Sequence, residues 1–200
     1  MAPAADLALL RPAPGASTAV PMSPSRRALL AASAVLACLS AGPVRGQPMV
    51  EARTKVRLAI VLARFTQWPA AALGAPGEPF QMCVLGRSDT LAAALAELAG
   101  QTVAGRPVRV NLQPDRSLAG CHLLYVHGAA GRAGAAALAP VAAAPILTIA
   151  DEEGFAARGG MVELVNVDDT LRLDINLRAL RGAQLVVSSQ VLKLALQVRE

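Results

Sequence analysis

Residues 151 to 163 read DEEGFAARGGMVE and contain the densest group of side chains suited to acid–base chemistry. Three consecutive acids precede Phe155 and Arg158. Paired carboxylates can act as general acid and base, but these acids have no evident partner elsewhere in the sequence. Charge runs of this kind most often lie in solvated loops. We therefore interpret the stretch as a loop, with Phe155 and Arg158 as candidate contacts for a protein or a small ligand.

Sequence motifs for enzyme chemistry are absent. The chain has no G-x-S-x-G, H-E-x-x-H, G-x-x-x-x-G-K-[ST] or G-x-G-x-x-G. It has only two histidines, and no pair of residues is placed like a nucleophile and its base. We expect neither catalytic residues nor a cofactor, and we predict that the protein is not an enzyme.

One short turn could hold an anion. Gly86-Arg87-Ser88-Asp89 lies between an expected strand and an expected helix, where free backbone N–H groups attract negative charge. Ser88 is the candidate anion-binding residue. The alternative, which we favour, is that Ser88 simply caps a helix from Asp89 to Ala99.

The compartment follows from the N-terminus. From Met22 the chain reads MSPSRRALLAASAVLACLSAGPVRGQ, with two arginines, an uncharged stretch and small residues at cleavage points. This is the form of a secretory signal, so we expect a leader over residues 1–46, cleaved near Gly46, and an exported domain over 47–200. Met22 is the expected true start, because residues 1–21 fit no targeting pattern.

The leader leaves the export route open. Arg26-Arg27 resembles a twin-arginine signal, so both the Sec and the Tat route remain. The tetrapeptide ending at Cys38 is a loose match to a lipoprotein cleavage box, which makes a lipidated Cys38 a minority alternative. The uncharged stretch is short for a bilayer span, so a retained anchor is disfavoured. In each case the expected location is the periplasm.

The cysteines and histidines of the exported domain could in principle form a metal site. Cys83, Cys121, His122 and His127 are of the right types for zinc. However, His122 and His127 are an odd number of residues apart and would point to opposite faces of one strand. We expect no metal site, and we place His127 in a solvated loop. A disulfide between Cys83 and Cys121 is the economical interpretation in an oxidising compartment, and two buried free thiols are the alternative.

Composition limits the class of partner. A chain of 200 residues with 54% hydrophobic content suits one domain. From Gln47 onward there are 15 basic and 13 acidic residues, a net charge of +2. That charge is too small to favour nucleic acid or an anionic membrane. Three Phe, one Trp and one Tyr also offer little for stacking bases.

Hydrophobic spacing predicts the elements of the domain. A helix from about Met49 to Phe65 is apolar over much of its circumference and ends before Trp68-Pro69. Strands then alternate with helices, which indicates a single α/β domain, a mixed β-sheet with helices packed on its faces. The expected strands are 80–85, 107–112, 121–126 and 146–150, and the expected helices are 88–99 and about 131–139.

The C-terminal part has a different pattern. Apolar and polar residues alternate from Leu171 to Asn176, and Asp168-Asp169 joins them to the run Met161 to Val167. This predicts a C-terminal β-hairpin with one buried face, followed by helices. The last helix is expected over Ser188 to Leu196. Its second apolar stripe, Leu192 and Leu196, is a candidate partner-binding surface.

Six segments, taken in order, resemble the YfiR family, also known as DUF4154. The resemblance covers about Glu51 to Val198, and no single segment is diagnostic. The GFAARGGM segment is similar to a strand-to-strand connection of that family, with Gly159 and Gly160 allowing unusual backbone angles. The segments lie at Lys55–Pro69 (ending FTQWP), Phe80–Gly86 (FQMCVLG), Gly120–Tyr125 (GCHLLY), Gly154–Met161 (GFAARGGM), Leu173–Leu177 (LDINL) and Ser188–Ala195 (SSQVLKLA).

The resemblance implies a periplasmic α/β domain without established catalytic residues. The best-studied member of the family represses a membrane-bound diguanylate cyclase by binding its periplasmic region. The family's structural disulfide corresponds to Cys83 and Cys121, whereas the second disulfide of some members has no cysteines here.

Two functions follow as hypotheses. The first is a non-enzymatic periplasmic regulator that binds the periplasmic region of an inner-membrane signalling protein, a diguanylate cyclase, and lowers cyclic-di-GMP. The second is a small-molecule-binding sensory module, in which the Gly86–Asp89 turn and the 151–161 loop close over a ligand. The oligomeric state stays open, with a homodimer as one alternative.

Overall fold

The first element of the described chain is a long helix, α2 (Gln47–Arg64). A computed structural model describes residues 47–112 and 117–200, and the expected leader lies outside them. The helix predicted from about Met49 to Phe65 is confirmed. Its buried residues, which recur at helical spacing and face the sheet, are Val56, Ala59, Ile60, Leu62 and Ala63.

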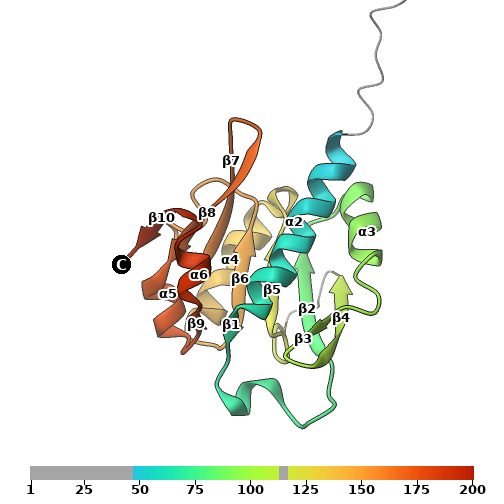
Figure 1. Ribbon diagram of the computed structural model, residues 1–200, viewed down its shortest axis with the longest axis vertical. Coiled ribbons are helices and arrows are strands. Elements are labelled where there is room, and N and C mark those ends of the chain that lie inside the picture. Colours follow the sequence, from blue (N-terminus) through green and yellow to red (C-terminus); the bar gives the residue numbers. More distant parts are fainter. Residues whose placement is uncertain (1–46, 113–116) are drawn as a thin grey trace, which may run out of the picture. The chain divides into compact units, whose positions relative to one another are not determined.

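A mixed sheet forms the centre of the molecule, with eight strands in the described residues (Figure 1). The five central strands, β7, β6, β5, β2 and β4, run parallel to one another. On one side β8 runs antiparallel to β7 and β10 runs parallel to β8, and on the other side β3 runs antiparallel to β4. The expected mixed α/β fold is therefore confirmed. In sheet order the strands are β10 (Ala195–Arg199), β8 (Thr170–Asn176), β7 (Val162–Val167), β6 (Leu147–Ala150), β5 (Leu123–Val126), β2 (Phe80–Leu85), β4 (Arg106–Leu112) and β3 (Thr102–Val103).

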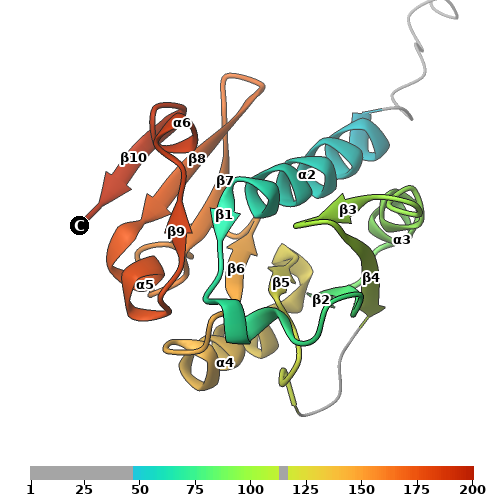
Figure 2. The same cartoon turned by 60° about the horizontal axis from the view of Figure 1, so that its bottom comes forward.

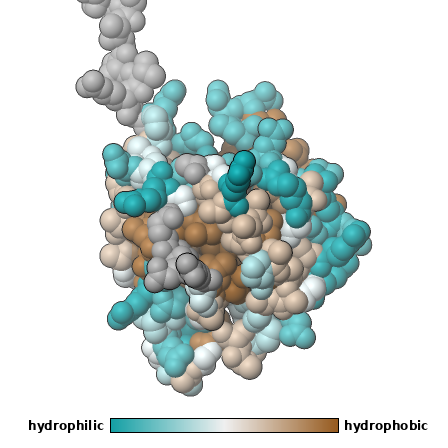
Figure 3. Space-filling model, turned by 180° about the vertical axis from the view of Figure 1, so that it is seen from behind, coloured by the Kyte–Doolittle hydropathy of each residue, from teal (hydrophilic) through white to brown (hydrophobic). Residues whose placement is uncertain are grey.

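Helices cover both faces of this sheet, as expected for parallel strands joined by crossovers. Figure 2 shows α2 and α3 (Asp89–Ala96) on one side and α4 (Arg132–Val141) on the other. The larger core cluster joins α2 and α3 to the sheet, and a second cluster joins α4 to the opposite face. Seen from behind, hydrophobic residues gather in the middle of the face and hydrophilic residues lie at its margins (Figure 3).

The chain changes direction across the sheet at β2. From β2 it passes through α3 to β4 on one side, and later strands, from β5 on, are added on the other side. The loops that leave β2 and β5 therefore diverge toward opposite faces. In open α/β sheets, such a switch point leaves a crevice outside the carboxyl ends of the strands.

The predicted hairpin is β7 and β8, paired from Val162↔Ile175 to Val167↔Thr170. Asp168 and Asp169 form its two-residue turn, with φ of 48° and 57°. Both angles are positive, as a type I′ turn requires. The hairpin places Leu173 and Ile175 in the core.

The predicted helix over 188–196 is wrong in its second half. After α5 (Leu177–Gly182) and the short strand β9 (Val186–Val187), which pairs with β1 (Thr66–Gln67), helix α6 covers only Ser189–Leu192. The chain then forms β10, which pairs parallel to β8. The apolar residues beyond Leu192 thus extend the sheet, because pairing with β8 satisfies backbone groups that a short terminal helix would leave unpaired.

Candidate functional site

Polar side chains converge at the carboxyl ends of β5 and β6. His127 directly follows β5 and Asp151 directly follows β6, and Lys55 reaches Asp151 from α2. Because β5 and β6 are parallel neighbours, these ends lie side by side. The expectations that His127 is solvated and that Asp151 lacks partners are therefore wrong. His127 and Asp151 each immediately follow a predicted strand. This position was the signal in the sequence that could have indicated that the two residues meet.

The carboxylate of Asp151 is the centre of this group, and its side chain is only 2% exposed. Its Oδ2 lies 2.9 Å from Nδ1 of His127 and accepts a hydrogen bond from Nζ of Lys55 at 3.1 Å. Its Oδ1 accepts the backbone N–H of Gly128 at 2.7 Å. A buried charge needs this degree of pairing to be tolerated. Lys55 also contacts Glu51 at 2.7 Å, one helical turn away.

Electrostatic interactions keep the side chains of Asp151 and Lys55 charged. Burial alone would raise the pKa of Asp151, but Lys55, His127 and the N–H of Gly128 outweigh burial and hold that pKa below its usual range. Burial would lower the pKa of Lys55, yet its contacts with Glu51 and Asp151 raise it overall. Burial and the nearby Asp151 carboxylate raise the pKa of the Tyr125 hydroxyl, so that hydroxyl stays protonated.

The pairing with Asp151 fixes the role of one nitrogen of His127. A carboxylate can only accept, so Nδ1 carries the hydrogen that lies between the two side chains. A histidine that acts as a general base activates a hydroxyl or thiol that is hydrogen-bonded to it. Within residues 47–112 and 117–200, no such nucleophile is hydrogen-bonded to His127.

Ser88 lies nearby, at the start of α3. Its hydroxyl accepts the N–H of Leu91 at 3.1 Å and lies 3.2 Å from the hydroxyl of Thr90. The predicted helix cap is confirmed, and the helix itself ends at Ala96. Ser88 also lines a cavity of about 430 Å³ together with Gly86, Arg87 and Asp89. Anion binding by Ser88 stays a prediction.

The loop that follows β6 is held down by a buried carboxylate. Glu163 on β7 accepts the N–H of Gly154 at 2.9 Å and the N–H of Ala156 at 3.1 Å. The ring of Phe155 is 1% exposed and packs in the core cluster on the α4 face. It lies so close to Gly160 that a Cβ there would overlap the ring. Phe155 therefore anchors the loop and offers no surface to a partner.

Arg158 is exposed, but its guanidinium folds back on its own loop. It donates to the carbonyl oxygen of Glu153 at 2.8 Å and to the carboxylate of Glu152 at 2.6 Å. A partner would have to compete with these contacts. A role for Arg158 in partner binding stays a prediction.

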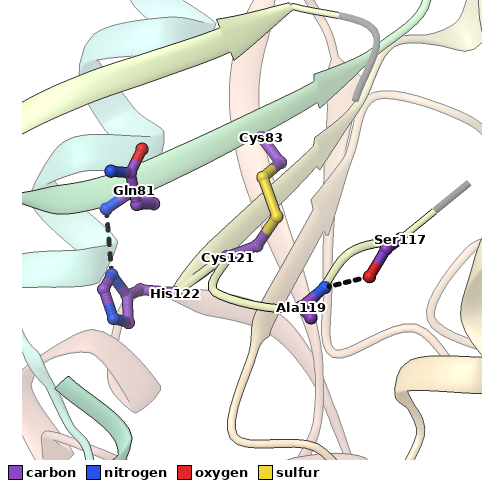
Figure 4. Close-up of a disulfide and its surroundings, with 6 residues drawn as sticks. All are labelled: Gln81, Cys83, Ser117, Ala119, Cys121 and His122. Atoms are coloured by element: carbon purple, nitrogen blue, oxygen red, sulfur yellow. Dashed lines mark hydrogen bonds between the residues drawn. A yellow bond between two sulfur atoms is a disulfide. The ribbon is translucent and has the colours of Figure 1, made fainter. Parts of the chain in front are cut away.

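Cys83 and Cys121 form a disulfide, with their Cα atoms 5.8 Å apart (Figure 4). It links β2 to the segment just before β5. The backbone N–H of Gln81 donates to Nδ1 of the neighbouring His122 at 2.9 Å, which adds a second link between the same two segments. The disulfide interpretation is confirmed over free thiols.

The C-terminal segment exposes apolar side chains. Leu194 is 70% exposed and Leu196 is 58% exposed, and Val198 follows on the same strand. Leu196 lies at an irregularity in the pairing of β10 with β8. Leu192, by contrast, is partly buried against the core. Leu192 and Leu196 were expected to form one apolar stripe, but they lie in different environments. Leu196 is exposed on β10, whereas Leu192 packs mainly against the core.

Among the described residues, no group of three or more His, Cys, Asp and Glu side chains could hold a metal ion. None of the described helices is long and apolar enough to cross a membrane.

Fold and site together define an α/β protein with an open mixed sheet, whose ionisable groups gather at the carboxyl ends of its central strands. The chain belongs to the YfiR/HmsC-like family, DUF4154, whose sequence model matches residues 52–196. The match spans both the polar group at the strand ends and the disulfide. A search among proteins of curated function finds no match to the chain. The family is a regulatory one.

Proposed function

We propose that this protein is a periplasmic, non-enzymatic regulator that binds the periplasmic region of an inner-membrane diguanylate cyclase and represses cyclic-di-GMP synthesis. Family membership supports the regulatory role. The disulfide and the signal-like leader support an exported location, since disulfides persist in oxidising compartments.

The observation that carries partner binding is the apolar surface of the C-terminal segment. Leu194, Leu196 and Val198 are all exposed within eight residues of the C-terminus. Leu196 and Val198 lie on the edge strand β10 and Leu194 lies in the turn just before it. Large apolar side chains gathered in this way are costly in water unless a partner covers them. An edge strand also offers unpaired backbone groups to a partner strand.

The test is cellular cyclic-di-GMP in a strain lacking the gene, compared with its parent. Cyclic-di-GMP should rise in the mutant and return to the parental level when the wild-type gene is restored. A level that does not change, in cells that express their cyclases, contradicts repression.

The docking surface is tested with the same strain. Restoring L194E/L196E should leave cyclic-di-GMP high, because both charges fall on the proposed contact. The matched control is L112E. Leu112 has a similar exposed fraction, 53%, and lies on β4, near the edge of the sheet opposite to β10. If L194E/L196E is folded and still lowers cyclic-di-GMP as L112E does, the C-terminal segment is not the contact.

A small-molecule sensory module is the second candidate, favoured by the cavity beside the Gly86–Asp89 turn. Thermal-shift screening with nucleotides, amino acids and inorganic anions tests it: a saturable stabilisation should be lost in S88A. The 151–161 loop contributes less to this cavity than the sequence suggested, since none of its residues lines it.

A further inference from the structure

A groove lies between α2 and the end of α3, on the face of the sheet that these two helices cover. It has a volume of about 270 Å³. Two buried apolar side chains, Ile60 at 2% exposure and Leu98 at 4%, line it together with the charged side chains of Arg57 and Arg64. The groove therefore combines an apolar lining with two guanidinium groups.

The guanidinium groups of Arg57 and Arg64 reach from α2 to the same short stretch of chain, which follows α3. Arg57 donates to the carboxylate of Glu97 at 3.3 Å. Arg64 donates to the side-chain oxygen of Gln101 at 2.7 Å and to the carbonyl oxygen of Thr102 at 2.8 Å. A guanidinium carries more N–H groups than these contacts use. Both arginines therefore keep hydrogen-bond donors for a ligand in the groove.

Positive charge is in excess beside the groove. Arg53, one helical turn before Arg57, contacts the same carboxylate of Glu97 at 2.6 Å. Within residues 47–112 and 117–200, Glu97 is the only acid in contact with any of the three arginines, and Arg64 contacts only neutral groups. Three positive charges against one negative charge leave an excess of two. Arginine stays protonated in proteins, so the three positive charges do not depend on pH.

A bound anion would relieve this excess. Like charges one helical turn apart repel each other, and a single carboxylate compensates the arginines only in part. Guanidinium groups bind phosphate through pairs of parallel N–H···O bonds. A phosphate monoester carries a charge of roughly −1.5 to −2 at neutral pH, which matches the excess on one small group. The groove is thus complementary to a phosphate monoester in charge and in hydrogen bonding.

We propose that the groove between α2 and α3 is a binding site for a small phosphate monoester, whose phosphate oxygens accept hydrogen bonds from Arg57 and Arg64. At about 270 Å³ it is smaller than the roughly 300–1,000 Å³ of pockets for drug-sized ligands, so the ligand has few atoms beyond the phosphate. Soluble phosphate esters and the headgroup of phosphatidic acid both carry this group. The site does not depend on repression of a cyclase, and it shares no lining residue with the cavity at Ser88.

The first test is titration calorimetry on the exported, processed protein with glycerol 3-phosphate, glycerol and succinate. Saturable heat is expected with glycerol 3-phosphate alone, because glycerol lacks the phosphate and succinate divides its two charges between its ends. R57Q should weaken this binding by about 10-fold, the loss of one hydrogen bond to a charged group, and R57Q/R64Q should weaken it further. The side chain of Arg57 is 70% exposed, so R57Q is expected to fold as the wild type does.

The lipid source is tested by flotation with phosphatidylcholine vesicles that contain or lack phosphatidic acid. Binding only to vesicles with phosphatidic acid, and without heat from glycerol 3-phosphate, would assign the site to the lipid headgroup. That binding should also be weakened in R57Q.

The matched control is R132Q/R172Q, which removes the same charge as R57Q/R64Q from exposed residues on α4 and β8, outside the groove. It should bind as the wild type does. The proposal is overturned if neither glycerol 3-phosphate nor phosphatidic acid binds, or if succinate binds as well as glycerol 3-phosphate. It is also overturned if R132Q/R172Q weakens binding as much as R57Q/R64Q, since general charge attraction would then explain the result.

Discussion

Glu163 and Gly154 are joined by a hydrogen bond of 2.9 Å between the backbone N–H of the glycine and Oε1 of the buried carboxylate. Together with the bond to Ala156, it ties the loop after β6 to the next strand along the sheet. The loop that begins with the three acids of residues 151–153 is thus held in place by a fourth acid, Glu163, which lies nine residues after Gly154.

Replacing Glu163 with Ala should lower the free energy of unfolding by about 2–4 kcal/mol. The change leaves the buried N–H of Ala156 and the partly buried N–H of Gly154 without an acceptor, and each such loss costs about 1–3 kcal/mol. Urea denaturation measures the loss. E153A, at an exposed residue of the same loop, is the control and should change stability by less than about 0.5 kcal/mol. Equal effects of the two substitutions would show that Glu163 does not hold the loop.

Removing the disulfide should destabilise the protein by about 3–4 kcal/mol. The bond closes a loop of 38 residues, and in the chain-entropy model its loss restores freedom to the unfolded chain. C83A/C121A measured by urea denaturation gives the value. Wild-type protein with a reductant should fall to nearly the same stability, whereas the double variant should not respond to the reductant. The prediction is contradicted if the reductant frees both thiols of the wild-type protein and its free energy of unfolding does not change.

Local pattern predicted most of the fold. Strand 80–85 matches β2 in full, and the Asp168-Asp169 turn lies where the sequence placed it, because alternation and turn chemistry are local signals. The C-terminus was misjudged for the opposite reason. Val191, Leu194 and Ala195 have helical spacing, but β10 forms through pairing with β8, a partner about 20 residues away whose contribution no local pattern contains.

The polar group was missed because its members are far apart in the sequence. Lys55 and Asp151 are separated by 96 residues, and His127 and Asp151 by 24. Their meeting depends on β5 and β6 being adjacent and parallel, which is a property of topology. The disulfide, by contrast, was predictable, since two cysteines in an oxidising compartment leave one pairing.

Stability should fall as the pH drops below about 6.5, the ordinary pKa of histidine. Burial lowers the pKa of His122, so the unfolded chain binds a proton more readily than the folded protein does. Stability from this residue is complete above the unfolded value and is lost progressively as the pH falls toward the lower folded value. The slope for one proton is at most about 1.4 kcal/mol per pH unit.

Urea denaturation at several pH values between 5 and 8 measures this dependence on the scale where histidines titrate. In H122N, whose amide oxygen can still accept the N–H of Gln81, the curve should be flatter than that of the wild type over this range. Parallel curves for the two proteins would assign the pH dependence to other groups.

The hairpin turn offers a stabilising substitution. Asp168 and Asp169 both have positive φ, a conformation that costs most residues with a Cβ about 1–2 kcal/mol. Asn-Gly is the preferred pair for a type I′ turn, because glycine has no such cost and asparagine tolerates the left-handed region. D168N/D169G also removes two adjacent like charges. The double variant should therefore gain about 0.5–1 kcal/mol in the free energy of unfolding.

The control places glycine one residue farther on. T170G falls in β8, where φ is ordinary and glycine only adds freedom to the unfolded chain, so it should lose about 0.5–1 kcal/mol. Thermal denaturation of the two variants should shift in opposite directions from the wild type. If D168N/D169G is instead destabilised, the aspartates make a contribution in the turn that outweighs their backbone cost, and the hairpin register would then depend on their side chains.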